Sequence, residues 1–161
     1  MNMTSPNNRT AERRLEKELR EFPTDPNIAA GPIDDTWFNW QAVIFGPEGT
    51  PYSGAAFFLS VVFPRDYPFQ PPEVRFADRI YHCSINDGHE RHRGTVSLDI
   101  LSDGPRGWFP CYSLYKVLQQ TVALLQNPEA NYCSVWACET RGREMKKLFA
   151  TNRAQYDENA A

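Results

Sequence analysis

The chain has 161 residues, the length of one domain. Its composition, with 41% hydrophobic and 23% charged residues, is that of an ordinary globular protein, and a formal charge of −3 gives no general attraction for nucleic acid. No apolar run approaches the roughly 20 residues needed to cross a bilayer, so we expect no membrane span.

The cysteines and the N-terminal segment indicate the compartment. None of the four cysteines belongs to a C-x-x-C pair, and the N-terminus lacks the apolar segment of a secretory signal. Acidic residues between the first arginines argue against an organellar presequence, which is normally poor in them. We therefore expect a cytoplasmic or nuclear protein, and leave an organellar assembly open.

Residues 1–9 are polar and are expected to form a flexible leader, whereas residues 10–161 are expected to form a single domain. Apolar side chains then recur at helical spacing: Ala11, Leu15, Leu19 and Phe22. This spacing predicts an amphipathic helix over 10–22. Another face of the helix carries basic residues such as Arg13 and Lys17, and the plain interpretation of such a stripe is a solvated surface.

Four short runs rich in aromatic and β-branched residues follow, at residues 28–33, 38–45, 56–63 and 74–76. Glycine and proline clusters separate them, which predicts an antiparallel four-stranded meander. A helix is then expected to begin at a serine cap, Ser113, and to end before Pro128. A last helix is expected to carry Met145, Leu148, Phe149, Asn152 and Tyr156. Together these elements predict an α+β fold.

The segment from Val74 to Tyr112 is irregular for most of its length. Irregular segments of this length inside a compact domain are uncommon and are usually functional. We therefore expect the functional residues to lie in this segment.

The chain also carries a series of landmarks in a fixed order. They are Gly31-Pro32, Asp34-Asp35, Trp40, Gly46-Pro47, Thr50-Pro51-Tyr52-Ser53-Gly54, Phe63-Pro64, Asp66-Tyr67-Pro68-Phe69-Gln70-Pro71-Pro72, Ile80-Tyr81-His82, Trp108 and Pro110. In order and spacing they resemble the ubiquitin-conjugating enzymes, over residues 10 to 157. The resemblance implies the UBC fold of that family: an N-terminal helix, a four-stranded antiparallel meander, a long active-site loop and C-terminal helices.

The resemblance makes Gly94-Thr95-Val96-Ser97-Leu98-Asp99 the counterpart of the family's active-site segment. In the family, a cysteine there takes the C-terminus of ubiquitin as a thioester, and here Ser97 stands at that position. A thiol with a pKa of about 8.5 supplies thiolate near neutral pH, and its thioester reacts readily with lysine amines. A serine hydroxyl needs an adjacent base, so the Ser97 form is expected to be inactive in thioester transfer.

A second departure lies at His82-Cys83-Ser84, where the family typically has His-Pro-Asn. The resemblance gives the asparagine the role of stabilising the oxyanion or the loop, and Ser84 is too short to replace it simply. His82 is expected to hold the loop through hydrogen bonds. Asp99 follows the family pattern and is expected to support the same loop.

A third departure lies at the gate before the last helices, which the resemblance places at Asn131 and Tyr132. An acidic or polar family residue there helps to position and deprotonate the incoming lysine. A tyrosine, with an unperturbed pKa of about 10, is a poor base at neutral pH. Trp108 and Pro110 follow the family pattern and are expected to be scaffold.

The resemblance also implies a surface for partner proteins. Its members are the basic residues of the first helix and the aromatic residues of two loops: Arg13, Arg14, Lys17, Phe69, Phe109 and Pro110. An exposed aromatic side chain beside prolines is a good anchor, because its burial loses little conformational entropy. The implied partners are ubiquitin or a ubiquitin-like protein, its activating enzyme, and a ubiquitin ligase or a larger protein assembly.

Three functions remain open. The first is a catalytically impaired family member that acts as an adaptor or structural subunit, which is favoured because the cysteine, the His-Pro-Asn step and the gate depart together. The second is an active conjugating enzyme in which an engineered serine at position 97 replaces the cysteine. The third is a thioester carrier that uses Cys83 or Cys133.

Other chemistry is not favoured by the spacing. A hydrolase nucleophile elbow needs glycines two residues on either side of the serine, where this chain has Thr95 and Asp99. Cys83, His89 and His92 are spaced irregularly for zinc and have no evident fourth ligand. We therefore expect neither a metal nor another cofactor.

Overall fold

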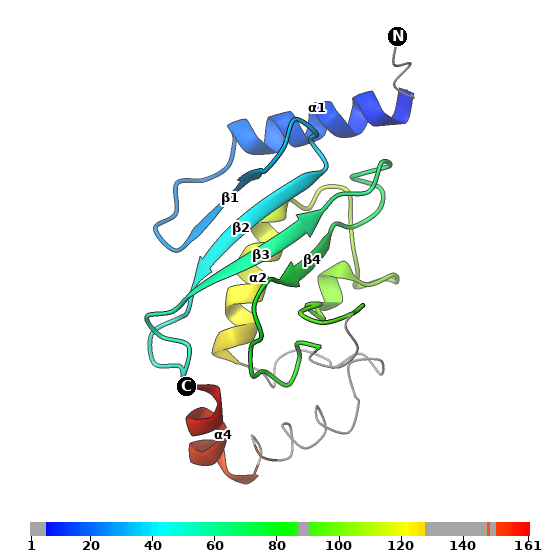
Figure 1. The fold of residues 1–161 in the computed structure, drawn as a ribbon. Coiled ribbons are helices and arrows are strands. Elements are labelled where there is room, and N and C mark those ends of the chain that lie inside the picture. The colour runs from blue at the N-terminus through cyan, green and yellow to red at the C-terminus, as the bar shows by residue number, and fades with distance from the viewer. Residues whose placement is uncertain (1–5, 87–90, 128–147, 149–150) are drawn as a thin grey trace.

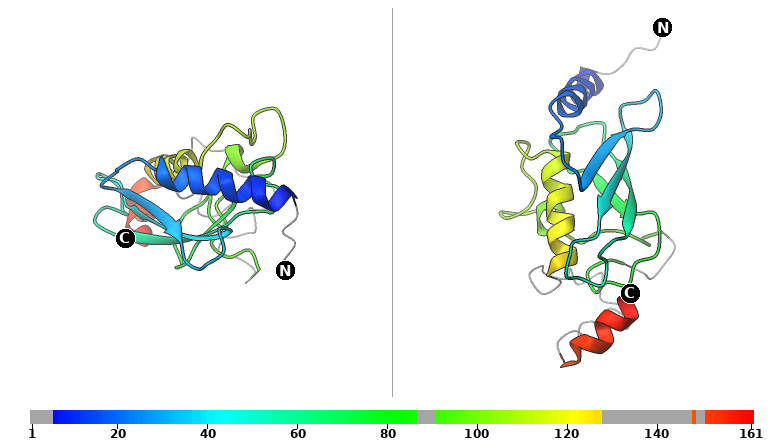
Figure 2. Two further views of the ribbon diagram at one scale, coloured as in Figure 1. Left: turned by 90° about the horizontal axis from the view of Figure 1, so that it is seen from above. Right: turned by 90° about the vertical axis from the view of Figure 1, so that its left-hand side faces the viewer.

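The computed structural model describes residues 6–86, 91–127, 148 and 151–161. Its elements are α1 (Pro6–Arg20), β1 (Ile28–Pro32), β2 (Asn39–Phe45), β3 (Ala56–Val62), β4 (Glu73–Phe76), the 3-10 helix η1 (Asp99–Leu101), α2 (Leu114–Gln126) and α4 (Arg153–Ala160). The four strands form one antiparallel sheet in chain order, with α2 on one face, α1 at one end and α4 near the other (Figures 1 and 2). The predicted α+β class and meander are confirmed. None of the described helices is long and apolar enough to span a membrane.

Alternation along the strands builds the core. In β2, Trp40, Ala42 and Ile44 are buried, whereas Gln41 and Phe45 between and after them are exposed. β3 repeats the pattern, so that one face of the sheet is apolar and packed while the other points away from α2. The sheet thus presents a single hydrophobic face for a helix to cover.

α2 is the helix that covers this face. Its buried residues recur three and four apart: Leu114, Val117, Leu118, Thr121, Leu124 and Leu125. Ser113 caps it as predicted, because its side-chain oxygen accepts a hydrogen bond from the backbone N–H of Lys116 at 3.3 Å. The predicted position and cap of this helix are therefore confirmed.

α1 begins earlier than the apolar spacing indicated. It starts at Pro6, so part of the segment expected to be a flexible leader is helical. Proline is favoured in the first turn, because its missing N–H would have no helical partner there. The helix ends at Arg20, and Phe22, which was predicted inside it, packs against Tyr115 after the helix has ended.

The last described helix, α4, begins after Asn152, which was predicted to lie within a helix. The Asn152 backbone has φ −148° and ψ 79°, and its side chain accepts a hydrogen bond from the N–H of Gln155 at 3.2 Å. Asparagine favours such a cap because its side chain satisfies a backbone donor of the first turn. This cap therefore sets the start of α4 at Arg153. Met145 and Phe149 lie outside the described residues.

Candidate functional site

The segment before Ser97 is held as an extension of the sheet. The N–H of Phe76 donates to the Gly94 carbonyl at 2.8 Å, and the N–H of Val96 donates to the Val74 carbonyl at 3.2 Å. Gly94 has a φ of +76°, and a Cβ there would collide with the carbonyl oxygen of Phe76. Only glycine fits this position, because it alone combines positive φ with so close a backbone approach. The long segment predicted to be irregular is thus anchored to β4.

Ser97 lies where this extension ends and η1 begins. Its N–H donates to the carbonyl of Ser84 at 3.3 Å, and Ile85 and Val96 form a β-bridge beside it. Ser97 is partly exposed. The fold therefore brings the predicted positions 84 and 97 together, and leaves the second of them accessible.

The side chain of Ser84 does not face the surface. Ser84 is fully buried, and its hydroxyl oxygen lies 3.8 Å from the sulfur of Cys83. A group without accessible surface cannot donate a hydrogen bond to a ligand that arrives at Ser97. The position at which the family resemblance predicts an oxyanion donor is therefore part of the core in this chain.

His82 joins the loop to α2. Its Nδ1 accepts a hydrogen bond from the N–H of Ser84 at 3.1 Å, and its Nε2 lies 3.0 Å from the carbonyl of Leu124. Because Nδ1 accepts, the proton of the neutral ring is on Nε2, which donates to Leu124. Burial lowers the pKa of His82 to about 4, although the Leu124 carbonyl opposes the shift. His82 is a buried neutral residue that fixes the loop.

Acidification is expected to destabilise the fold through His82. As the pH falls below about 6.5, the unfolded chain binds a proton that the folded chain refuses down to a pH of about 4. The contribution of His82 to the free energy of unfolding is therefore fully present above pH 6.5, and about 3 kcal/mol of it is lost as the pH falls to about 4. Urea unfolding at a series of pH values measures the loss. Hydrogen bonds also lower the pKa values of the Asp25 and Asp34 carboxyls, but these groups act at lower pH.

The matched control is His82→Gln, which keeps a donor for the Leu124 carbonyl but does not titrate. Its stability is expected to be nearly constant between pH 6.5 and 4. Parallel pH profiles for the two proteins would show that other groups cause the loss.

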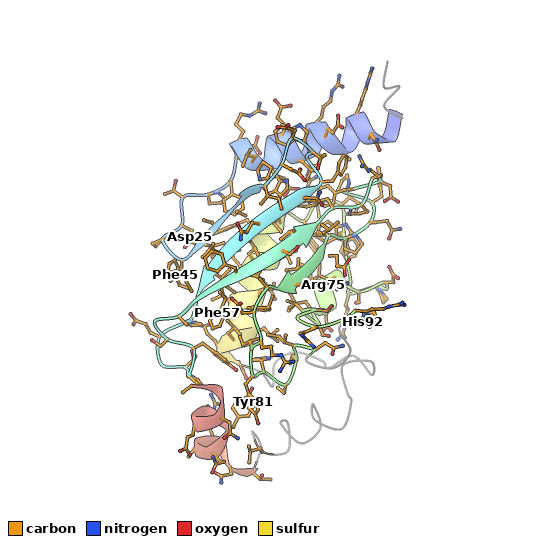
Figure 3. All side chains as sticks on the ribbon, in the orientation of Figure 1. Asp25, Phe45, Phe57, Arg75, Tyr81 and His92 are labelled. Atoms are coloured by element: carbon orange, nitrogen blue, oxygen red, sulfur yellow. The ribbon has the colours of Figure 1, made fainter. Side chains whose placement is uncertain are left out.

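Tyr156 of α4 packs against the loop on its other side. Its ring lies 5.4 Å from that of Tyr81, which Figure 3 labels beside α4. Its hydroxyl lies 3.5 Å from that of Tyr52, and the Tyr52 hydroxyl donates to the Tyr81 carbonyl at 2.6 Å. Burial raises the pKa of Tyr156 to about 12. Cys83 is buried in this cluster, with 3% of its surface exposed. Sequence reasoning missed this cluster, because no local pattern pairs the last helix with residues 81–83.

Other predicted site residues are placed as follows. Asp99 is exposed, and its backbone carbonyl accepts hydrogen bonds from the N–H and hydroxyl of Ser102. Asn131, Tyr132 and Cys133 lie outside the described residues, as does His89. Within the described part of the chain, His, Cys, Asp and Glu side chains form no group of three that would hold a metal.

Trp108 connects the two loops that carry the predicted aromatic anchors. Its indole N–H donates to the carbonyl of Pro68 at 2.6 Å, and its ring lies 5.9 Å from that of Tyr67. Phe69 and Phe109 flank this link and are exposed, at 69% and 43%. The fold therefore brings the two loops together and leaves both aromatic side chains at the surface.

Arg14 differs from the basic residues beside it in α1. Its guanidinium donates to Glu18 at 2.7 Å and to the carbonyls of Pro110 and Tyr112 at 2.9 and 2.8 Å. Arg13 and Lys17 are exposed. Arg14 therefore ties α1 to the Phe109-Pro110 loop, and its predicted role in partner binding stays a prediction.

A comparison with protein families identifies the chain. The model of the family described as ubiquitin-conjugating enzyme matches residues 14–161. The chain belongs to the ubiquitin-conjugating enzyme family. Membership accounts for the UBC fold seen here, and it places the chain among proteins that interact with ubiquitin, its activating enzyme and its ligases.

Proposed function

We propose that this ubiquitin-conjugating-family protein does not carry ubiquitin as a thioester, and that it acts as an adaptor or structural subunit. The observation that carries the proposal is the pair of residues at the active-site loop. Ser97 offers a hydroxyl where the family needs a thiolate, and Ser84 beside it is fully buried. The loop therefore supplies neither the expected nucleophile nor an oxyanion donor from position 84.

Cys83 is a poor replacement nucleophile. Only 3% of its surface is exposed, and its burial against Tyr156 keeps its sulfur from a protein-sized electrophile. Cys133 and the gate lie outside the described residues. The burial of Cys83 therefore supports the adaptor proposal over a carrier that uses Cys83 as its nucleophile.

Incubation with activating enzyme, ATP and ubiquitin is expected to give no thiol-labile adduct, because position 97 has no thiolate. Nonreducing gels, with and without added thiol, measure this. A reducible ubiquitin band would contradict the proposal, and its loss in Cys83→Ala or Cys133→Ala would identify the nucleophile. An adduct that resists thiol but is cleaved by mild base would instead favour an active enzyme with an engineered serine.

Phe69→Ala is expected to weaken binding of a ubiquitin-ligase domain by about 1 to 2 kcal/mol, the effect typical of an interface anchor. Phe69 is the most exposed large hydrophobic residue described, so its truncation should scarcely change the stability of the fold. Calorimetry measures the affinity. Phe58→Ala, which removes another exposed aromatic side chain from β3, is the matched control.

Two outcomes of this experiment would show that the partner surface lies elsewhere on the protein. Unchanged affinity in both Phe69→Ala and Arg13→Glu would exclude α1 and the Phe69 loop as the partner surface, and residues 87–93 would be the next to be tested. An equal loss in Phe58→Ala would point to the outer face of the sheet.

A further inference from the structure

A polar cavity of about 240 Å³ lies between η1 and the first turns of α2. Its polar lining consists of Asp99, Arg106, Tyr112, Lys116 and Gln120. We call it the η1–α2 cavity. Two of its lining residues, Leu98 and Asp99, directly follow Ser97 in the sequence. Neither the predicted chemistry nor the predicted partner surface uses Arg106, Lys116 or Gln120.

The cavity is lined by two cations and one carboxylate, and among the described residues the cations form no close ion pair. Arg106 and Lys116 are exposed, and within the described residues neither lies within 4.0 Å of a carboxylate. Lys116 instead lies over the Tyr112 ring, 4.9 Å from its centre. The positive end of the α2 dipole adds to the same potential. This is a local concentration of positive charge in a chain whose formal charge is −3.

Asp99, the acidic residue of the lining, favours an acidic peptide over a bare inorganic anion. Asp99 puts a carboxylate in the same cavity, which opposes a bare inorganic anion. A peptide fits better, because its backbone N–H groups are donors for Asp99 while an acidic side chain reaches Arg106 and Lys116. The volume is smaller than the roughly 300 Å³ at which small-molecule pockets begin, so it suits one side chain.

The cavity is also continuous with the proposed partner surface. The Tyr112 ring that lies against Lys116 is 5.5 Å from the Phe109 ring and 6.0 Å from that of Trp108. A segment that covers Phe109 therefore reaches the cavity along Tyr112.

We propose that the η1–α2 cavity receives an acidic side chain, a carboxylate or a phosphoserine, from an extended segment of the protein that docks at Phe69 and Phe109. The identity of that protein rests on the proposed function, whereas recognition of an acidic peptide by the cavity does not. The two are therefore tested separately.

The test is a titration of the isotope-labelled full chain with capped pentapeptides, Ala-Ala-X-Ala-Ala, followed by NMR. Peptides with X as glutamate or phosphoserine are expected to shift the signals of Arg106, Lys116 and Gln120. The glutamine peptide is expected to bind at least roughly tenfold more weakly, because it lacks the charge. Binding by the phosphoserine peptide alone would support a phosphorylated partner, and binding by both would support an acidic one.

Charge reversals make the test specific. Arg106→Glu and Lys116→Glu are each expected to weaken peptide binding roughly tenfold. Both residues are exposed, and Lys116 lies in the first turn of α2, where glutamate is favourable, so both variants should fold. Arg79→Glu, at an exposed arginine that does not line the cavity, is the matched control and should bind like the parent.

Three results would overturn the proposal: equal binding of the glutamine peptide, equal losses in all three charge reversals, or inorganic phosphate binding as tightly as the phosphoserine peptide. Phe69→Ala should bind the pentapeptides normally. Failure of the cavity is thus distinguishable from failure of the proposed partner surface.

Discussion

Ser97→Cys is expected to accept ubiquitin as a thiol-labile adduct, yet to transfer it to lysine roughly 100- to 1,000-fold more slowly than a variant whose oxyanion step is also restored. The new thiol stands at a partly exposed position, so charging by the activating enzyme has its nucleophile. The buried Ser84 leaves the reaction without a donor from the neighbouring position.

The comparison variant adds Cys83→Pro and Ser84→Asn to Ser97→Cys. Single-turnover discharge to free lysine, after charging and removal of ATP, isolates the transfer step. Asparagine is larger than the fully buried Ser84, so unfolding curves must first show that the triple variant is folded. Full family-like transfer by Ser97→Cys alone would reject an impaired site and favour an engineered serine in an active enzyme.

Glu18→Ala is expected to destabilise the fold by about 3 kcal/mol. The Glu18 side chain is 8% exposed and accepts hydrogen bonds from three directions. The donors are the Arg14 guanidinium, the Tyr67 hydroxyl and, at 2.8 Å, the N–H of Leu114 at the start of α2. Burial and this carboxylate together raise the pKa of Tyr67. Alanine would leave the Tyr67 hydroxyl and the Leu114 N–H without this acceptor, whereas Arg14 keeps the Pro110 and Tyr112 carbonyls, so the buried link between α1 and the start of α2 would be lost.

Glu21→Ala is the matched control for Glu18→Ala. Its side chain is 60% exposed just after the end of α1, and its only described ion pair, with Lys17, is 4.0 Å long. An exposed pair of this kind contributes about 0.5 kcal/mol or less. Urea denaturation of both variants gives the comparison, and similar losses would mean that the buried network does not hold α1 in place.

Local patterns sufficed wherever a neighbour in sequence decides the conformation. The period-two runs gave β2 and β3, and Ser113 marked the start of α2, because side-chain alternation and capping act within a few residues. The same logic failed at Asn152. Asn152 caps α4 although the apolar spacing places it inside a helix, and spacing alone does not show which preference prevails.

Long-range packing decided what local patterns left open. Arg14 and Lys17 both belong to a basic stripe in the sequence, yet only Arg14 reaches the carbonyls of Pro110 and Tyr112, which are far away along the chain. Tyr156 became part of the site only because α4 returns to the loop that carries Cys83. Contacts of this kind depend on how whole elements meet.

The sequence by itself determined the family, the α+β architecture and the serine at position 97, because these follow from residue identity and from periods read over short windows. Only the tertiary structure decided that Ser84 is buried, that His82 is a neutral link to α2, and that Arg106 and Lys116 share a cavity. The physical reason is that burial and charge proximity are properties of assembled surfaces. A side chain acquires its solvation and its neighbours only when distant segments pack around it.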